Sequence, residues 1–284
     1  MNLDGIHHVT CITGDARQNV EYYTGVLGLR LVKKSVNQDD PTVYHLFYAD
    51  ENGTPGSDIT FFEYPGAAPG RAGAGMIHTV VWRVGSEEAL DFWRKRVGSV
   101  PFRDPEGLQH DLVVVDVTDE PLVADHPDIP RELALQGFEG VRAYAAAPDA
   151  NAAFLDALGF VDGYTRGETR SGWIRYEESP GAGIPGAGTV HHVAWSSPMD
   201  KHEAWRQRVI DAGGRPTQVI DRFWFRSIYF REPNGVLFEI ATLGPGFAAD
   251  EDPAHLGEKL ILPPAFEHLR AEVEPILTPL PATR

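Results

Sequence analysis

Short apolar runs rich in aromatic and β-branched side chains recur along the chain. Tyr44-His45-Leu46-Phe47-Tyr48 and Ile228-Tyr229-Phe230 are typical examples. Runs of this length and composition predict β-strands. After residue 243 the composition shifts to glycine, proline and acidic residues, so the strands are expected before that point.

Helical patterns appear between the strand runs. Ser86 precedes two glutamates, which is the arrangement of an N-cap followed by acidic first-turn residues. Asp200 with Glu203 three residues later resembles a capping box, and Gly213-Gly214 supplies the stop for that helix. A last short helix is expected from about Pro264.

The same order of elements repeats four times. Ile77-His78-Thr79-Val80-Val81-Trp82 lines up with Val190-His191-His192-Val193-Ala194-Trp195, and Gly140-Val141-Arg142-Ala143 lines up with Gly5-Ile6-His7-His8. We therefore expect an α+β fold of four modules, each a strand followed by a helix and more strands. The expected module spans are 4–66, 75–135, 139–180 and 188–243.

Larger units follow from these spans. The first two modules form an N-terminal pair over residues 4–135, and the last two form a C-terminal pair over residues 139–243. Residues 244–284 form a tail with a short helix, which we expect to act as a lid or a packing arm.

A His-His-Val tripeptide occurs twice, as His7-His8-Val9 in the first module and His191-His192-Val193 in the fourth. At the position of the second histidine, the two middle modules have Thr79 and Ala143. A metal site that uses both retained histidines must bring modules one and four together. We therefore expect these two modules to form one barrel-like half of the molecule and modules two and three to form the other.

Glu239 lies in an otherwise apolar strand of the fourth module. A carboxylate buried there without a partner would cost several kcal/mol. Two imidazoles and one carboxylate make up the facial triad of non-haem Fe(II) sites, which leaves other coordination positions open. The sequence therefore predicts a metal site formed by His8, His192 and Glu239.

Glu63 is the alternative carboxylate. A glyoxalase-type site with two histidines and two glutamates would need it as a fourth ligand. However, the step from Gly56 to Thr60 matches the step from Gly235 to Glu239, counted from the turn glycine of each module. We therefore expect Glu63 to point outward and not to bind the metal.

The net charge of the chain excludes some classes of binding partner. Acidic residues number 41 against 25 Lys plus Arg, which gives a net charge of −16. This argues against a nucleic-acid or anionic-membrane partner, because no basic field attracts phosphates. The single cysteine, Cys11, excludes an intramolecular disulfide. With no signal-like segment or membrane span, a cytoplasmic protein is expected, and a homo-oligomer is compatible with the sequence.

Three segments together resemble a known family. They are Gly5-Ile6-His7-His8-Val9-Thr10, the run from Asp221 to Glu239, and the tail from Leu256 to Pro264. The chain resembles the vicinal-oxygen-chelate superfamily, which includes glyoxalase I, bleomycin-resistance proteins and extradiol dioxygenases. Within it, the chain is most similar to the ring-cleaving dioxygenases of hydroquinones.

The resemblance implies a site and a cofactor. It implies Fe(II), with Mn(II) as a possible substitute, and a small aromatic substrate whose ring is cleaved with both atoms of O₂. The implied metal ligands are His8, His192 and Glu239. The implied pocket residues are His7, Thr10, His191, Arg222 and Tyr229.

Strand geometry tests these pocket residues. Neighbouring residues face opposite ways, so His7 and His191 can approach the metal only if their strands are bent. Thr10 shares the face of His8. Arg222 and Tyr229 are seven residues apart and can line one pocket only if the chain turns between them. As functional groups, Arg222 would favour an anionic substrate or intermediate.

The function expected from all this is Fe(II)-dependent, extradiol-type ring cleavage of a hydroquinone or catechol-like phenol. His191 would act as the base, and Tyr229 or His7 as the acid. Two rivals stay open: a glyoxalase-like lyase or isomerase, and a non-catalytic protein that sequesters aromatic compounds.

Overall fold

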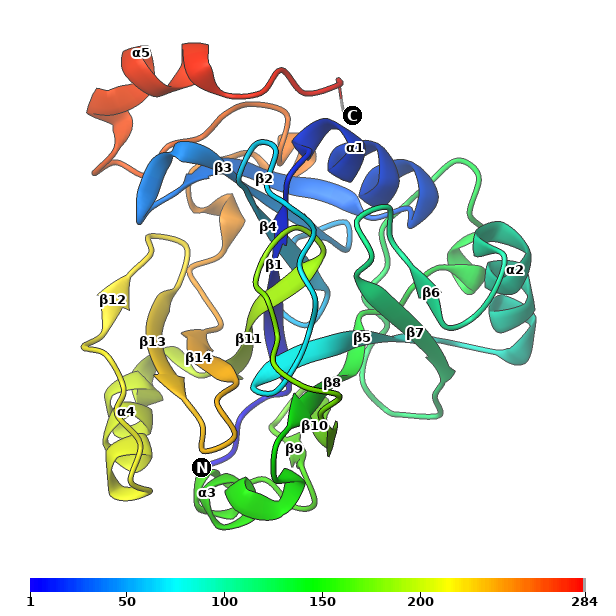
Figure 1. Cartoon of the computed structure of the whole chain (residues 1–284). Helices are drawn as coiled ribbons and strands as arrows, with labels where there is room; N and C mark the ends of the chain where they lie inside the picture. Colours follow the sequence, from blue (N-terminus) through cyan, green and yellow to red (C-terminus); the bar gives the residue numbers. More distant parts are fainter. Residues whose placement is uncertain (283–284) are drawn as a thin grey trace.

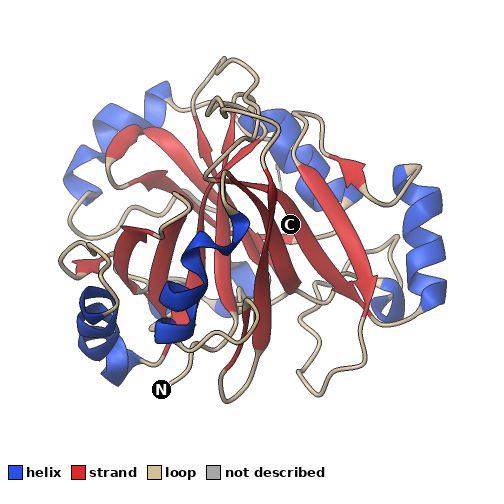
Figure 2. Ribbon diagram, turned by 60° about the horizontal axis from the view of Figure 1, so that its bottom comes forward, coloured by secondary structure: helices blue, strands red, loops and turns tan. Residues whose placement is uncertain are grey.

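Two curled β-sheets form the centre of the molecule, and the helices lie around its outside (Figures 1 and 2). The computed structural model describes residues 1–282. In spatial order the eight-stranded sheet contains β12 (Ile220–Asp221), β13 (Arg226–Arg231), β14 (Leu237–Thr242), β11 (Thr189–Ser197), β1 (Ile6–Thr13), β4 (Asp58–Glu63), β3 (Asp40–Ala49) and β2 (Arg30–Asn37). The six-stranded sheet contains β6 (Phe102–Arg103), β7 (Gln109–Val114), β5 (Met76–Val84), β8 (Phe138–Ala145), β10 (Ser171–Glu178) and β9 (Tyr164–Arg166).

The strand order shows which modules lie together. β1 pairs with β11 in antiparallel fashion, so modules one and four share the eight-stranded sheet. β5 pairs with β8, so modules two and three share the other sheet. This confirms the two halves expected from the ligand positions. Over residues 75–180 each module contributes three strands instead of four, so the repeat is shorter there.

The helices follow the first strand of each module. They are α1 (Ala16–Val20), which continues as a π-helix (Glu21–Val26), α2 (Glu87–Val97), α3 (Ala152–Leu158) and α4 (His202–Asp211), with α5 (Arg270–Val273) in the tail. Short 3₁₀ turns occupy 131–133, 148–151, 199–201, 247–249, 253–255, 267–269 and 274–276.

Two predicted helix starts have different outcomes. The Ser86 side chain accepts a hydrogen bond from the Ala89 amide, so the predicted N-cap of α2 is confirmed. The predicted capping box at Asp200 is wrong. A 3₁₀ turn at Met199–Lys201 precedes α4, and the Asp200 carboxylate pairs instead with the ammonium of Lys201 at 2.6 Å.

The register of the two sheets corrects one alignment. Val9 pairs with Val193 in one sheet, and Val80 pairs with Val141 in the other. The residue that corresponds to His192 in module three is therefore Gly140, not Ala143. The two alignments differ by three residues, so they would turn opposite faces of β8 toward the core.

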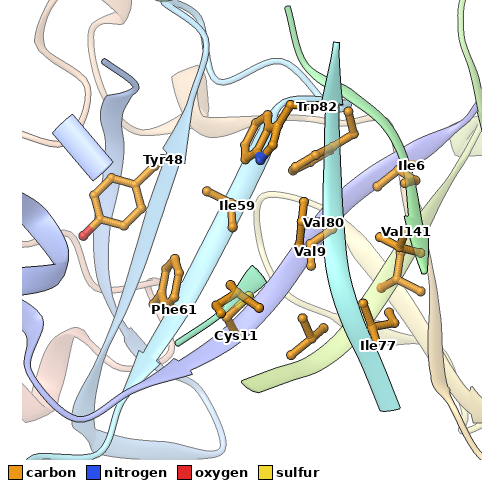
Figure 3. Close-up of a cluster of buried hydrophobic side chains, with 14 of the residues drawn as sticks. Ile6, Val9, Cys11, Tyr48, Ile59, Phe61, Ile77, Val80, Trp82 and Val141 are labelled. Carbon is orange, nitrogen blue, oxygen red and sulfur yellow. The ribbon is translucent and has the colours of Figure 1, made fainter. Parts of the chain in front are cut away.

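A hydrophobic core lies between the sheets. Val9 and Cys11 of β1, Val80 of β5 and Val141 of β8 are fully buried members of one cluster (Figure 3). Cys11 is thus a buried apolar residue, and burial raises the pKa of its thiol well above the usual value. Because strand residues alternate between faces, β1 turns His8 and Thr10 to the side opposite this core.

Gly140 shows how the six-stranded sheet differs from the other. Its neighbour on β10 is Trp173, and a Cβ atom added to Gly140 would lie 2.2 Å from the Trp173 ring. The Arg175 guanidinium lies over the Trp173 ring, 4.4 Å from its centroid. The place that corresponds to a metal ligand is thus filled by an aromatic ring.

The C-terminal tail packs along β2 instead of hanging free. The Ile261 amide donates to the Lys34 carbonyl at 2.9 Å, and a Cβ atom at Gly257 would collide with the Leu31 carbonyl. Lys33 is fully buried, and its ammonium contacts the carboxylates of Asp250, at 2.8 Å, and Glu251. These contacts describe a packing arm. No helix within residues 1–282 is long and apolar enough to span a membrane.

The buried ammonium gives a stability prediction. Lys33→Met should lower the free energy of unfolding by about 3 kcal/mol, because the partly buried carboxylates of Asp250 and Glu251 lose their buried counter-charge. Chemical denaturation followed by tryptophan fluorescence measures the change. Lys34→Met is the matched control, because the Lys34 ammonium bonds only the exposed carbonyl of Glu258, and it should cost less than about 1 kcal/mol. Equal losses would contradict a role for Lys33 in holding the tail.

Candidate metal centre

Three side chains from three adjacent strands meet on the concave face of the eight-stranded sheet. They are His8 on β1, His192 on β11 and Glu239 on β14, and all three are buried. Oε2 of Glu239 lies 2.9 Å from Nε2 of His192 and 3.2 Å from Nε2 of His8, and the two Nε2 atoms are 3.3 Å apart. Residues distant in sequence thus present their ligand atoms to one point.

The cluster fits a divalent metal ion. Glu239 is fully buried, and its Oε2 faces the two histidine Nε2 atoms without a well-aligned hydrogen bond to a described residue. A buried carboxylate oxygen without a partner is costly, and a metal would satisfy it. Burial opposes ionisation of Glu239, but the His8 and His192 rings hold the pKa of its carboxyl well below the usual value. Two imidazoles and one ionised carboxylate form a facial ligand set.

A β-bulge aims the first histidine pair. Ile6 pairs with Trp195 and His8 with Ala194, so His7 is the extra residue of the ladder. His7 is buried, and its Nε2–H donates to the Thr242 carbonyl at 3.1 Å. Its Nδ1 then accepts from Nδ1–H of His8 at 2.9 Å, which leaves Nε2 of His8 unprotonated toward the metal position.

The second histidine pair is arranged like the first, with the roles of β1 and β11 exchanged. Thr10 pairs with His192 and Cys11 with Val190, so His191 is the extra residue of β11. Nδ1 of His191 lies 2.8 Å from Nδ1 of His192. His191 is exposed and opens onto a different cavity from the one beside the metal cluster. The bends thus bring both outer histidines to the ligands, but behind them and not in the pocket.

Burial fixes the protonation state of His7. Burial, with a further contribution from His8, lowers the pKa of His7 to about 3. The ring is therefore neutral at pH 7, and both of its nitrogens are already engaged. This arrangement orients His8 and does not leave His7 free to protonate a substrate.

Ser227 holds the carboxylate ligand and was missed by the sequence reasoning. Its hydroxyl, fully buried on β13, donates a short hydrogen bond to Oε1 of Glu239. This bond turns Oε2 toward the two histidines. A serine two residues before Tyr229 carries no distinctive signal, since only the β13–β14 register brings it to the glutamate.

Module one lacks the matching carboxylate. Thr10 pairs with Thr60 just as Ala194 pairs with Glu239, so Thr60 stands where a fourth ligand would be. The Thr60 hydroxyl donates to Oγ1 of Thr10 at 2.8 Å. Thr10 is fully buried and supports Thr60 instead of lining the pocket.

Glu63 lies away from the ligand cluster. Its Oε1 accepts from the Thr278 hydroxyl at 2.7 Å and the Ala16 amide at 3.3 Å. It faces away from the ligands, and the tail and α1 bury it. The cluster of potential ligands among the described residues does not include it.

A pocket opens beside the ligands. It is narrow, with a cavity volume of about 30 Å³. Its lining residues are His8, Asn37, Gln38, Asp39, His45, Phe47, Phe62, His192, Arg222, Trp224, Phe225 and Tyr229. The aromatic side chains suit a planar ring, and the polar ones suit its substituents.

Arg222 and Tyr229 both line this pocket because the chain turns between them. β12 ends at Asp221 and β13 begins at Arg226, and the Arg222 amide closes the turn on the Phe225 carbonyl at 2.9 Å. The Arg222 guanidinium lies over the Tyr229 ring, 5.5 Å from its centroid. Burial, with the charge of Glu239, raises the pKa of Tyr229, so its phenol is protonated at neutral pH.

His45 is a second pocket residue that the sequence reasoning missed. Its Nε2 lies 2.9 Å from the Thr60 hydroxyl, and its ring packs on Phe47 and Phe62. The β3–β4 register gives His45 the place that Ser227 has in module four. Burial lowers the pKa of His45 well below the usual value, so the ring is neutral.

Comparisons with known proteins show the family of this chain. The sequence model of the Glyoxalase/Bleomycin resistance protein/Dioxygenase superfamily matches residues 5–112. A Bacillus subtilis protein named "Putative ring-cleaving dioxygenase MhqA" is 37% identical, over 99% of this chain and 100% of that protein. The chain belongs to the ring-cleaving dioxygenases of this superfamily.

Two further relatives extend the match. A protein of Sphingobium indicum named chlorohydroquinone/hydroquinone 1,2-dioxygenase is 32% identical, over 95% of each chain. A crystal structure described as a putative dioxygenase from Bacillus subtilis has 36% identity and a TM-score of 0.90, over 100% of this chain and 99% of that one. The glyoxalase-type fold expected from the sequence is thereby confirmed, and the protein is a dioxygenase whose substrate is an aromatic ring.

The ligand cluster gives the first site prediction. His8→Ala or Glu239→Gln should abolish tight binding of a divalent metal, because each removes a direct ligand. Metal content after dialysis and titration with Mn²⁺ measure the loss. Glu63→Gln is the matched control for Glu239→Gln and should keep its metal. A site emptied equally by the two substitutions would refute the three-ligand arrangement and favour a four-ligand one.

Ser227 gives the second site prediction. Ser227→Ala should weaken metal binding by about 10–100-fold, the usual effect of removing a group that orients a ligand. Competition with a calibrated chelator measures the affinity. Ser196→Ala is a suitable control, because its hydroxyl is equally buried but makes no hydrogen bond among the described residues. An unchanged affinity in Ser227→Ala would show that Glu239 needs no such support.

Proposed function

We propose that this dioxygenase uses Fe(II), with Mn(II) as a substitute, for extradiol-type cleavage of a hydroquinone or catechol-like ring. The observation that carries the proposal is a ligand set of two imidazoles and one carboxylate beside an aromatic pocket. Such a set leaves coordination positions free for other ligands. The relative named as a hydroquinone 1,2-dioxygenase supports the substrate class.

The bound metal would supply a Lewis acid for a phenolate oxygen and a redox partner for O₂. The protein residues orient the metal ligands and the substrate ring. His7 and His191 orient the two imidazole ligands, and Ser227 orients Glu239. The aromatic walls hold the ring plane, and their apolar surface keeps water from the reacting face.

Pocket hydrogen-bond donors would orient the substrate. A catechol can chelate a metal through two oxygens, whereas a hydroquinone reaches it through one. A hydroquinone therefore depends more on protein contacts for its orientation. Tyr229 offers a protonated phenol, Arg222 offers N–H donors, and His45 offers a neutral imidazole on the same pocket. We assign proton donation to Tyr229, because His7 lies behind a ligand.

The direct test is oxygen uptake. Protein loaded anaerobically with Fe²⁺ should consume one O₂ per ring when mixed with hydroquinones or catechols, and the ring absorbance should disappear. Turnover without O₂, with Ni²⁺ or Zn²⁺ bound, would indicate a lyase or isomerase. Tight binding with no turnover under any condition would indicate a sequestering protein.

The pocket geometry gives a prediction on substrate orientation. Tyr229→Phe or Arg222→Met should reduce hydroquinone turnover by about 10²-fold, the scale for a lost positioning or acid–base group. Catechols, held by chelation, should lose less. Oxygen consumption rates measure both, and metal analysis should show that the metal stays bound. Equal losses for the two substrate classes would contradict orientation of a hydroquinone by these residues.

A further inference from the structure

The pocket contains one cationic side chain, and its charge is already paired. Arg222 is the sole Lys or Arg among the pocket-lining residues, all of which lie in the described part of the chain. Nη1 and Nη2 of Arg222 bond Oδ1 and Oδ2 of Asp39 at 3.1 and 2.9 Å. This is the two-pronged geometry in which a guanidinium recognises a carboxylate. Asp39 itself belongs to the pocket lining.

The two partners are held in place by their turns. Asp39 lies between β2 and β3, where the Asp39 amide donates to Oδ1 of Asn37 at 3.0 Å. The Gln38 side-chain amide donates to the Arg222 carbonyl at 2.9 Å. The hairpin thus contacts the Arg222 segment through the Gln38 side chain as well as through the ion pair. The turn that carries Asp39 is therefore tied to the Arg222 segment at more than one point, although the Asp39 carboxylate itself is largely exposed.

We propose that Asp39 is a specificity-determining residue that restricts the pocket to uncharged rings. The proposal rests on the proposed function and adds the charge of the substrate. An anionic ring substituent at Arg222 would have to displace Asp39 and would still lie next to its carboxylate. A neutral hydroxyl needs neither change, because a guanidinium has five N–H donors and Asp39 occupies two of them.

The size of the effect follows from exposure. The Asp39 side chain is 71% exposed and that of Arg222 14% exposed, so the ion pair is only partly shielded from water. Exposed pairs contribute about 1 kcal/mol or less, and an anion can compete with one. The repulsion between the anion and the displaced carboxylate adds to this. We therefore expect discrimination of roughly tenfold and not an absolute barrier.

Asp39→Asn tests the proposal, because it removes the charge and retains the size and a hydrogen-bond acceptor. The probes are hydroquinonesulfonate, whose sulfonate is a poor metal ligand, and neutral methylhydroquinone. Dissociation constants are measured without O₂ by quenching of tryptophan fluorescence, and kcat/KM is measured by oxygen uptake. The preference for hydroquinonesulfonate over methylhydroquinone should be about tenfold higher in the variant than in the wild type, by both measures.

Asp40→Asn is the matched control. It changes the net charge equally one residue away, but Asp40 bonds Thr42 and does not line the pocket. Its preference ratio should stay within about twofold of wild type. An unchanged ratio in Asp39→Asn, or an equal rise in both variants, would overturn the proposal. If neither protein binds either ring, the proposed substrate class fails, and this inference fails with it.

Discussion

The antiparallel pairing of β1 with β11 is the contact on which the rest of the site depends. It closes a loop of 184 residues between His8 and His192 and sets Thr10 opposite His192. The parallel addition of β14 to β11 then brings Glu239 beside the two imidazoles. Loop-closure entropy grows only slowly with length, and burial of Val9 and Val193 opposes it. The ligands are thus placed by sheet register and not by any local motif.

The two halves of the site are related but unequal. In module four the carboxylate of Glu239 is held by Ser227, while in module one Thr60 is held by His45 at the same ladder positions. The duplicated frame therefore supplies two imidazoles but a single carboxylate. At the fourth position, where a glyoxalase-type site would have a ligand, Thr60 instead hydrogen-bonds the pocket residue His45. Because module one has Thr60 where module four has Glu239, the ligand cluster stays open on the side of the pocket.

The sequence predicted the modules, their pairing and the three candidate ligands, because those depend on repeats and on the period of two. It did not predict the roles of His7 and His191, because a β-bulge is one extra residue that leaves the local pattern unchanged. It also did not reveal His45, Ser227 or Asp39. These reach the site through contacts with other strands and turns, which depend on register and on hairpin geometry.

Gly140 and Trp173 bear on whether this fold depends on a bound metal. The six-stranded sheet has the same pairing as the metal-binding sheet, yet an indole ring fills the place where a ligand would project. In that half, apolar packing between the sheets is joined by a buried ion pair between Arg83 and Asp119. By analogy, the core can shape the eight-stranded sheet as well, so the proposed metal would serve chemistry and not architecture. A protein of this kind would fold before it acquires the proposed ion.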